Sequence, residues 1–234
     1  MTTLASHRSP PLMLRAIIFD CDGVIADTEP LHFAELQRVL AEEGIALTEE
    51  DYYCYYLAFD DRGCFRKAFS DSAVLTTEKL AELIDRKASY IEPAMRTHLR
   101  LFPGVADFIR RAARAYPLVV ASGALRREIE LVLDFGGVRD CFLAIVSAED
   151  VARGKPDPES FLKAHGIINA HAAVPISPQE CLVIEDSLHG VEAAHLAGMP
   201  VLAVTNSYSK DQLSKADFVV ESLDGLSLDS LQAP

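Results

Sequence analysis

Two aspartates followed by a glycine are the first residues in the chain that could do chemistry. Asp20, Asp22 and Gly23 come directly after the short apolar run 16–19. An apolar run without alternation is typical of a strand covered on both faces of a parallel sheet. Ligands of such sheets bind beyond the carboxyl ends of the strands, so both carboxylates are expected where a substrate binds. Taken alone, Asp-x-Asp-Gly is explained equally well by an ordinary turn.

Other apolar runs along the chain are also followed by polar residues. These are Ser122 after 118–121, Lys155 in the loop after 144–146, and Glu185 and Asp186 after 181–184. Neighbouring parallel strands end at the same edge of a sheet, so these side chains are expected to converge with those of Asp20 and Asp22. Four clustered carboxylates repel one another unless a cation is present. Oxygen ligands without a neighbouring His or Cys favour Mg²⁺ as that cation.

A carboxylate beside Mg²⁺ is a suitable nucleophile for phosphorus. We expect Asp20, at the strand end itself, to attack a phosphate ester and form an aspartyl-phosphate. Asp22 is placed to protonate the leaving oxygen and later to take a proton from water. Ser122 and Lys155 are expected to bind the oxygens of the transferring phosphoryl group.

Each of these residues also has a purely structural interpretation. Ser122 alone is better explained as the cap of a helix that starts near Ala124, and most lysines are solvated. Prolines at 156 and 158 stiffen the loop around Lys155, which favours a fixed position at a helix start. Glu185 and Asp186 could belong only to a helix cap. The recurrence at four strand ends makes an entirely structural explanation improbable.

The elements that must position these residues alternate between helices and short apolar strands. Strands are predicted at 16–19, 118–121, 144–146, 181–184, 201–204 and 218–220, with amphipathic helices between several of them. This alternation predicts an α/β fold with a doubly wound, Rossmann-like parallel sheet. Residues 28–100 instead predict consecutive helices, the fourth at 80–91 before Pro93. We therefore expect a core domain of 1–27 and 101–234 and an inserted helical domain of 28–100.

The overall composition restricts the partners of the chain. The formal net charge of −13 argues against binding nucleic acid through bulk charge. No apolar stretch is long enough to span a membrane, and the polar start at 1–11 lacks the apolar core of a signal peptide. Five scattered cysteines fit a reducing compartment. We expect a cytoplasmic monomer that binds a small phosphorylated molecule and neither nucleic acid nor membrane.

Four segments resemble, in order, the motifs of the haloacid dehalogenase superfamily. They are 19–24, 121–123, 154–158 and 184–187, and the resemblance spans nearly the whole chain. The helical insertion directly after the first segment resembles the cap of the β-phosphoglucomutase-like subgroup. That resemblance implies a Mg²⁺-dependent phosphatase or phosphomutase with an α/β core and a helical cap that closes over the site.

The resemblance also implies a role for each core residue. Asp20 is the nucleophile and a metal ligand, and Asp22 is the general acid and base and binds the metal through its backbone carbonyl. Phosphate is bound by Ser122 and Lys155. The remaining metal ligands implied by the resemblance are Glu185 and Asp186. The second aspartate speaks against the dehalogenase branch of the superfamily.

In the helical insertion the resemblance covers fewer residues. Thr28 and His32 match positions at the cap entrance that face substrate in the subgroup. Arg86 and Lys87 resemble a basic pair on a cap helix, in which Lys87 is able to meet a second phosphate. A packed or solvated helix position explains His32 and Lys87 equally well. The segment 56–62 lacks the Lys-Gly pair expected before the cap arginine, which weakens the case for phosphoglucomutase activity; Arg62 remains a candidate second-phosphate ligand.

The sequence therefore predicts a Mg²⁺-dependent phosphatase of a small phosphorylated metabolite, most simply a sugar phosphate, acting through an aspartyl-phosphate. One alternative is a sugar phosphomutase, because it needs the same core residues. A second is a phospho-acceptor signalling module, in which an aspartate at a strand end is also phosphorylated. Asp22 and the large insertion favour an enzyme over the signalling module.

Overall fold

A computed structural model of the chain describes residues 13–69 and 75–228. They form two compact units, one from residues up to Ala26 and from Leu101 onward, the other Asp27–Arg100. We call the first the sheet unit and the second the helical unit. The polar tail expected at 1–11 lies outside the described residues.

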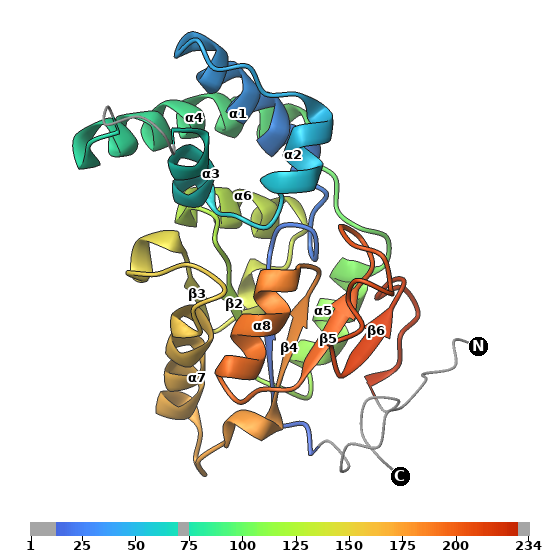
Figure 1. Cartoon of the computed structure of the whole chain (residues 1–234). Helices are drawn as coiled ribbons and strands as arrows, with labels where there is room; N and C mark the ends of the chain where they lie inside the picture. The colour runs from blue at the N-terminus through green and yellow to red at the C-terminus, as the bar shows by residue number, and fades with distance from the viewer. Residues whose placement is uncertain (1–12, 70–74, 229–234) are drawn as a thin grey trace. The chain divides into compact units, whose positions relative to one another are not determined.

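Over its described residues, the sheet unit is built on six parallel strands. They are β1 (Ala16–Phe19), β2 (Leu118–Ala121), β3 (Ala144–Val146), β4 (Cys181–Glu185), β5 (Val201–Val204) and β6 (Phe218–Val220). Their order in the sheet is β3-β2-β1-β4-β5-β6: the chain adds β2 and β3 on one side of β1, then crosses to its other side and adds β4, β5 and β6 (Figure 1). This order confirms the predicted doubly wound parallel sheet, and β1 and β4 are its central strands.

Helices cover both faces of this sheet. The helices of the sheet unit are α5 (Val105–Ala113), α6 (Arg126–Phe135), α7 (Glu159–His171) and α8 (Leu188–Leu196), with short 3₁₀ turns η1 (Arg139–Cys141), η2 (Ala148–Asp150) and η3 (Pro178–Glu180). Figure 1 shows α7 and α8 in front of the sheet and α5 behind it. Strands covered in this way are buried on both faces, which explains their continuous apolar sequences.

Alternate residues of β1 pack against different helices. Ile18 belongs to one core cluster with Phe161 of α7 and Val191 of α8. Phe19 points to the other face, where its ring lies 6.2 Å from that of Phe108 in α5, edge to face. Every residue of β1 is completely buried, so the strand is fixed and the residues that follow it are held in place.

In the part of the helical unit that the structure describes, four helices pack around their own apolar core. They are α1 (Glu29–Glu42), α2 (Glu49–Tyr55), α3 (Asp61–Ala68) and α4 (Thr77–His98). Thr48 caps α2, since its side chain accepts a hydrogen bond from the Asp51 N–H at 3.0 Å. The Tyr52 hydroxyl donates to Glu29 at 2.7 Å, which ties α2 to α1.

The prediction that the fourth helix of the insertion ends before Pro93 is wrong. Helix α4 continues to His98, with Pro93 inside it. Proline removes one backbone hydrogen bond from a helix interior. Ile91 and Met95 on either side of it are both buried, and the burial of this apolar stripe outweighs the lost bond.

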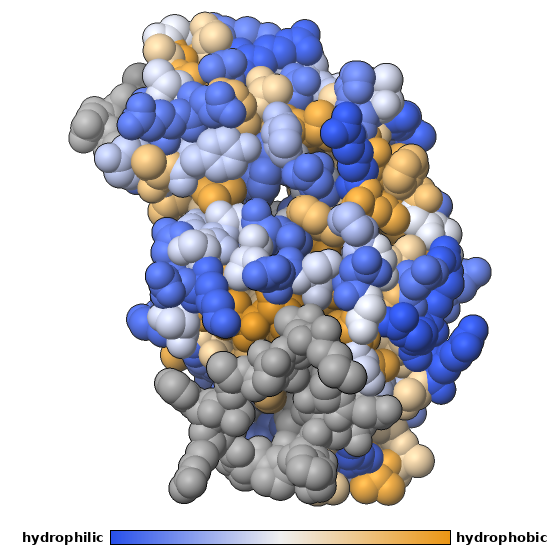
Figure 2. All heavy atoms as spheres, turned by 90° about the vertical axis from the view of Figure 1, so that its right-hand side faces the viewer, coloured by the Kyte–Doolittle hydropathy of each residue, from blue (hydrophilic) through white to orange (hydrophobic). Residues whose placement is uncertain are grey.

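Among the described residues, no helix has both the length and the apolar composition needed to cross a membrane. Figure 2 shows hydrophilic and hydrophobic residues intermixed on one face of the molecule. Isolated apolar residues on a surface are normal in folded proteins.

Candidate active site

The predicted site residues follow the central strands at the same level of the sheet. Phe19 of β1 is in register with Val120 of β2 and with Ile184 of β4. Asp20 continues the ladder beyond the strand, since its N–H donates to the carbonyl of Ile184 at 2.9 Å. The register therefore brings the ends of β1, β2 and β4 together, as the sequence indicated.

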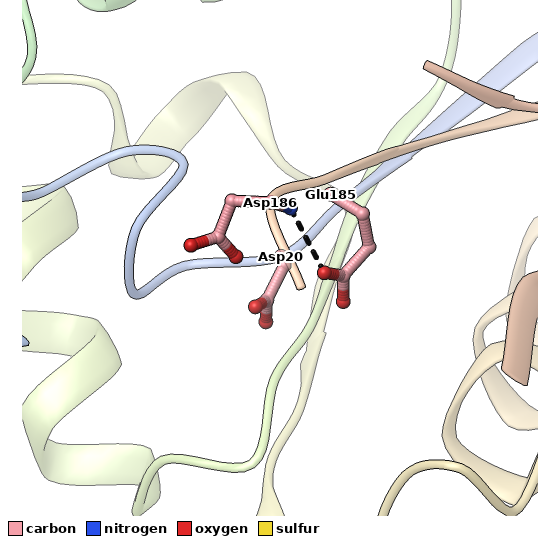
Figure 3. A group of neighbouring side chains, drawn as sticks. All are labelled: Asp20, Glu185 and Asp186. Carbon is pink, nitrogen blue, oxygen red and sulfur yellow. Dashed lines mark hydrogen bonds between the residues drawn. The ribbon is translucent and has the colours of Figure 1, made fainter. Parts of the chain in front are cut away.

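Three carboxylates meet at this edge of the sheet. Asp20, Glu185 and Asp186 each offer an oxygen, and these oxygens lie within 4.8 Å of one another (Figure 3). All three residues are buried, with exposed fractions of 8%, 0% and 4%. Buried like charges this close together raise one another's pKa unless a positive charge offsets them.

Lys155 supplies one such positive charge. Its ammonium lies 3.0 Å from Asp20 Oδ1 and 2.5 Å from Glu185 Oε1, and it also lies over the ring of Phe161. Burial lowers the pKa of Lys155, but the charges of Asp20 and Glu185 raise it by more, so the net shift is upward and the lysine is charged. One ammonium leaves a net negative charge on the three carboxylates.

Burial and the remaining negative charge raise the pKa of Asp20. The pKa of Asp20 is raised to about 7, because burial and the charges of Glu185 and Asp22 raise it by more than Lys155 lowers it. A carboxylate with this pKa is partly protonated at neutral pH and then is a poor nucleophile. A hard divalent cation held by Asp20, Glu185 and Asp186 would balance the charge and keep Asp20 ionised, so this donor set fits Mg²⁺.

Glu185 is anchored by the start of α8. Its Oε2 accepts a hydrogen bond from the Asp186 N–H at 2.9 Å (Figure 3). The same oxygen accepts hydrogen bonds from the Ser187 N–H at 3.0 Å and the Ser187 hydroxyl at 2.9 Å. Ser187 is the residue that caps α8, because its side chain accepts from the Gly190 N–H at 3.0 Å. The capping explanation therefore applies to Ser187 and leaves Asp186 for other contacts.

Asp22 lies outside the group of three carboxylates. It is half-buried, and the turn that carries it closes when the Gly23 N–H donates to the carbonyl of Ala26 at 2.9 Å. Gly23 has a φ of +71°. A β-carbon on Gly23 would lie 1.9 Å from Asp186 Oδ2, so only glycine fits between this turn and the carboxylate.

Ser122 is buried directly after β2, where its Oγ accepts a hydrogen bond from the Ala124 N–H at 3.2 Å. It does not cap the following helix, because α6 begins later, at Arg126. A hydroxyl that accepts one hydrogen bond can still donate another, so this contact is compatible with binding a phosphate oxygen.

Within the helical unit, two of the four predicted residues are in contact. The Lys87 ammonium lies 2.8 Å from His32 Nδ1 and forms an ion pair with Asp61. Because an ammonium only donates, Nδ1 of His32 accepts this hydrogen bond and its ring proton is on Nε2. Asp61 was not singled out by the sequence, since nothing in its spacing relates it to α1 or α4.

The other two predicted residues take different positions in this unit. Thr28 is the N-cap residue of α1 and is buried, but its side chain makes no capping hydrogen bond. Arg62 is the second residue of α3 and is half-buried.

Comparison with known proteins identifies the family. A sequence profile described as haloacid dehalogenase-like hydrolase matches residues 17–204, which includes every core motif discussed above. The chain belongs to this family. It shares its fold with β-phosphoglucomutase from Clostridium difficile, on which it superposes with a TM-score of 0.81 and 24% identity, covering 94% of this chain and 96% of the other.

Two further members of the family resemble this chain over most of its length. It is 28% identical to the fructose-1-phosphate phosphatase YqaB of Escherichia coli, over 80% of this chain and 95% of that protein. It is 26% identical, with a TM-score of 0.82, to a variant of CbbY from Rhodobacter sphaeroides in complex with xylulose-(1,5)bisphosphate, covering 94% of this chain and all of the other. This haloacid dehalogenase-like hydrolase is therefore an enzyme of the phosphatase type.

Proposed function

We propose that the protein is a Mg²⁺-dependent phosphatase that hydrolyses a small phosphorylated metabolite, a sugar phosphate in the simplest case. The observation that carries this proposal is the position of Asp20. Its carboxyl group lies at the end of the central strand, beside Lys155 and within reach of two further carboxylates. Lysine and acidic groups around one carboxylate are what transfer of a phosphoryl group requires.

In the first step, an oxygen of Asp20 attacks the phosphorus atom of the ester. The bond from phosphorus to the substrate oxygen breaks, and Asp22 donates a proton to that leaving oxygen. The products are the free alcohol and an aspartyl-phosphate on Asp20. Lys155 and Ser122 bind oxygens of the phosphoryl group, and their hydrogen bonds offset the charge that develops on it.

In the second step, a water molecule attacks the phosphorus of the aspartyl-phosphate. Asp22, now ionised, takes a proton from this water, and the bond between phosphorus and the Asp20 oxygen breaks. Inorganic phosphate leaves and both aspartates return to their starting states. When bound by Asp20, Glu185 and Asp186, Mg²⁺ supplies positive charge that stabilises the phosphoryl oxygens.

The helical unit is proposed to act as the cap domain, with Thr28, His32, Arg62 and Lys87 as candidates for selecting the substrate. The ion pair between Lys87 and Asp61 reduces how strongly Lys87 can bind a second phosphate group of a substrate. A lysine whose charge is already offset attracts a second phosphate less strongly than an unpaired lysine. Substrates with one phosphate group are therefore favoured over bisphosphates.

The test is phosphate release from a panel of sugar monophosphates and bisphosphates, including fructose-1-phosphate and xylulose-(1,5)bisphosphate. Each substrate is assayed with Mg²⁺ and with a chelator, and Asp20→Asn serves as the blank. We expect release that needs the metal and vanishes in the blank. Release that persists in the blank would contradict Asp20 as the nucleophile.

A panel without any release would point to the phosphomutase alternative. In that reaction the phosphoryl group on Asp20 returns to a bound sugar phosphate instead of passing to water. The deciding assay is the exchange of one sugar-phosphate isomer into another, started by a catalytic amount of the bisphosphate. A phospho-form that persists for hours without either activity would instead favour the signalling module.

A further inference from the structure

The loop after β5 makes two contacts that the sequence did not indicate, one with the turn after β1 and one with the carboxylate cluster. Asn206 Nδ2 donates a hydrogen bond to the carbonyl of Gly23 at 2.7 Å. The hydroxyl of the next residue, Ser207, donates to Asp186 Oδ2. Two consecutive residues of one loop therefore hold the turn after β1 and the carboxylate after β4.

These two contacts close a ring of four groups. Gly23 lies against Asp186, since a β-carbon on Gly23 would be only 1.9 Å from Asp186 Oδ2. Asp186 accepts a hydrogen bond from the Ser207 hydroxyl. Asn206, the residue before Ser207 in the chain, donates a hydrogen bond to the carbonyl of Gly23 and so completes the ring. Such a ring fixes the spacing between the turn that carries Asp20 and Asp22 and the side chain of Asp186.

A second serine in the same loop, Ser209, makes a different kind of contact from Ser207. Ser209 makes a local turn, in which both its N–H and its hydroxyl donate to Gln212 Oε1, at 3.0 Å and 2.9 Å. Ser207 instead reaches a buried carboxylate that lies on another strand end. Hydroxyl groups that bond a ligating carboxylate orient it and raise its affinity for the ion.

We propose that Ser207 is a positioning residue that orients Asp186 for binding a divalent cation, and that Asn206 holds the facing turn for the same purpose. This inference rests on the proposed function, because it assumes that Asp186 binds Mg²⁺. Removing the Ser207 hydroxyl takes this hydrogen bond from the Asp186 carboxylate, which is then less well oriented before the ion binds.

The experiment is titration of the purified protein with MgCl₂ in a calorimeter, without substrate. Ser207→Ala is expected to weaken Mg²⁺ binding about tenfold. Ser207→Thr keeps a hydroxyl at the same position and is expected to restore the affinity. Asn206→Ala tests the other half of the ring and is expected to weaken binding in the same direction. Ser209→Ala is the matched control and should bind Mg²⁺ as the unaltered protein does.

Each outcome separates this inference from the proposed function. Equal affinities of the unaltered protein and Ser207→Ala would overturn the inference and leave the magnesium site intact. Equal losses in Ser207→Ala and Ser209→Ala would overturn it too, because the effect would then belong to the loop in general. Absence of Mg²⁺ binding in the unaltered protein would overturn the magnesium site itself, and with it the proposed function.

Discussion

A β-carbon on Gly190 would lie 1.9 Å from the carboxyl carbon of Glu185. Gly190 is in the first turn of α8, and its N–H is the group that Ser187 caps. The absence of a side chain at this position lets the helix start approach the carboxylate that holds Lys155. The geometry of the site therefore depends on a residue that has no chemistry of its own.

Gly190→Ala is expected to lower the rate of phosphate release about 100-fold, because a displacement of about 1 Å in a catalytic group has effects of this size. The measurement is steady-state phosphate release on the best substrate of the panel. Gly166→Ala is the matched control: this glycine lies within α7, and a β-carbon there would meet nothing within 4 Å. It should leave activity unchanged and stabilise the protein by about 1 kcal/mol. Equal activity in both variants would show that Glu185 tolerates displacement.

Asp22→Asn is expected to affect substrates according to their leaving groups. Sugar alcohols are poor leaving groups and need a proton, so their release should slow by about 100-fold or more. A nitrophenolate leaves readily without a proton, so formation of the phospho-enzyme from p-nitrophenyl phosphate should slow much less. Rapid-quench measurement of the first turnover isolates this step. An equal loss for both substrates would assign Asp22 a structural role.

Asp20 makes the stability of the metal-free protein depend on pH. Burial raises its pKa to about 7 from an ordinary value of 3.8. Between these values the folded protein holds a proton that the unfolded chain has released. The free energy of unfolding therefore falls as the pH rises from about 4 to 7. Urea unfolding in the presence of a chelator should show this fall, and Asp20→Asn should show a smaller one. Parallel pH profiles for the two proteins would contradict the raised pKa.

The ion pair in the helical unit is expected to matter for stability. Lys87 is buried, and Asp61→Asn leaves its charge without the carboxylate, which should destabilise the protein by about 3 kcal/mol. Adding Lys87→Met should recover part of this loss. Glu82→Gln is the comparison, because Glu82 is half exposed. This substitution should lower the free energy of unfolding by less than about 1 kcal/mol. Denaturant unfolding measures all of these variants, and a small effect of Asp61→Asn would show that Lys87 is stable without its partner.

The central part of the fold and its cluster could be predicted from sequence because both follow from local patterns. Short apolar runs identified the strands, and polar residues directly after them marked one edge of the sheet. The cluster of Asp20, Glu185 and Asp186 arises from strand register alone. No longer-range information was needed to expect these side chains together.

Other contacts could not be predicted because they join segments far apart in the sequence, and no local sequence pattern relates those segments to each other. Asp61 meets Lys87 only after α3 packs on α4, and Ser207 meets Asp186 only after β5 pairs with β4. The passage of α4 through Pro93 depends on tertiary burial, which outweighs the local preference of proline. Side-chain contacts across the fold thus add to a site whose framework is set by sequence pattern.

The two ends of the helical unit have a consequence for how such proteins diversify. Ala26 and Leu101 are joined by an antiparallel bridge, and the N–H of Asp27 donates to the carbonyl of Arg100 at 2.9 Å. The insertion thus leaves and returns at one point, so its length places no demand on the pairing of β1 with β2. During evolution such a segment can be replaced by another of different length without disturbing the strands that carry Asp20 and Glu185.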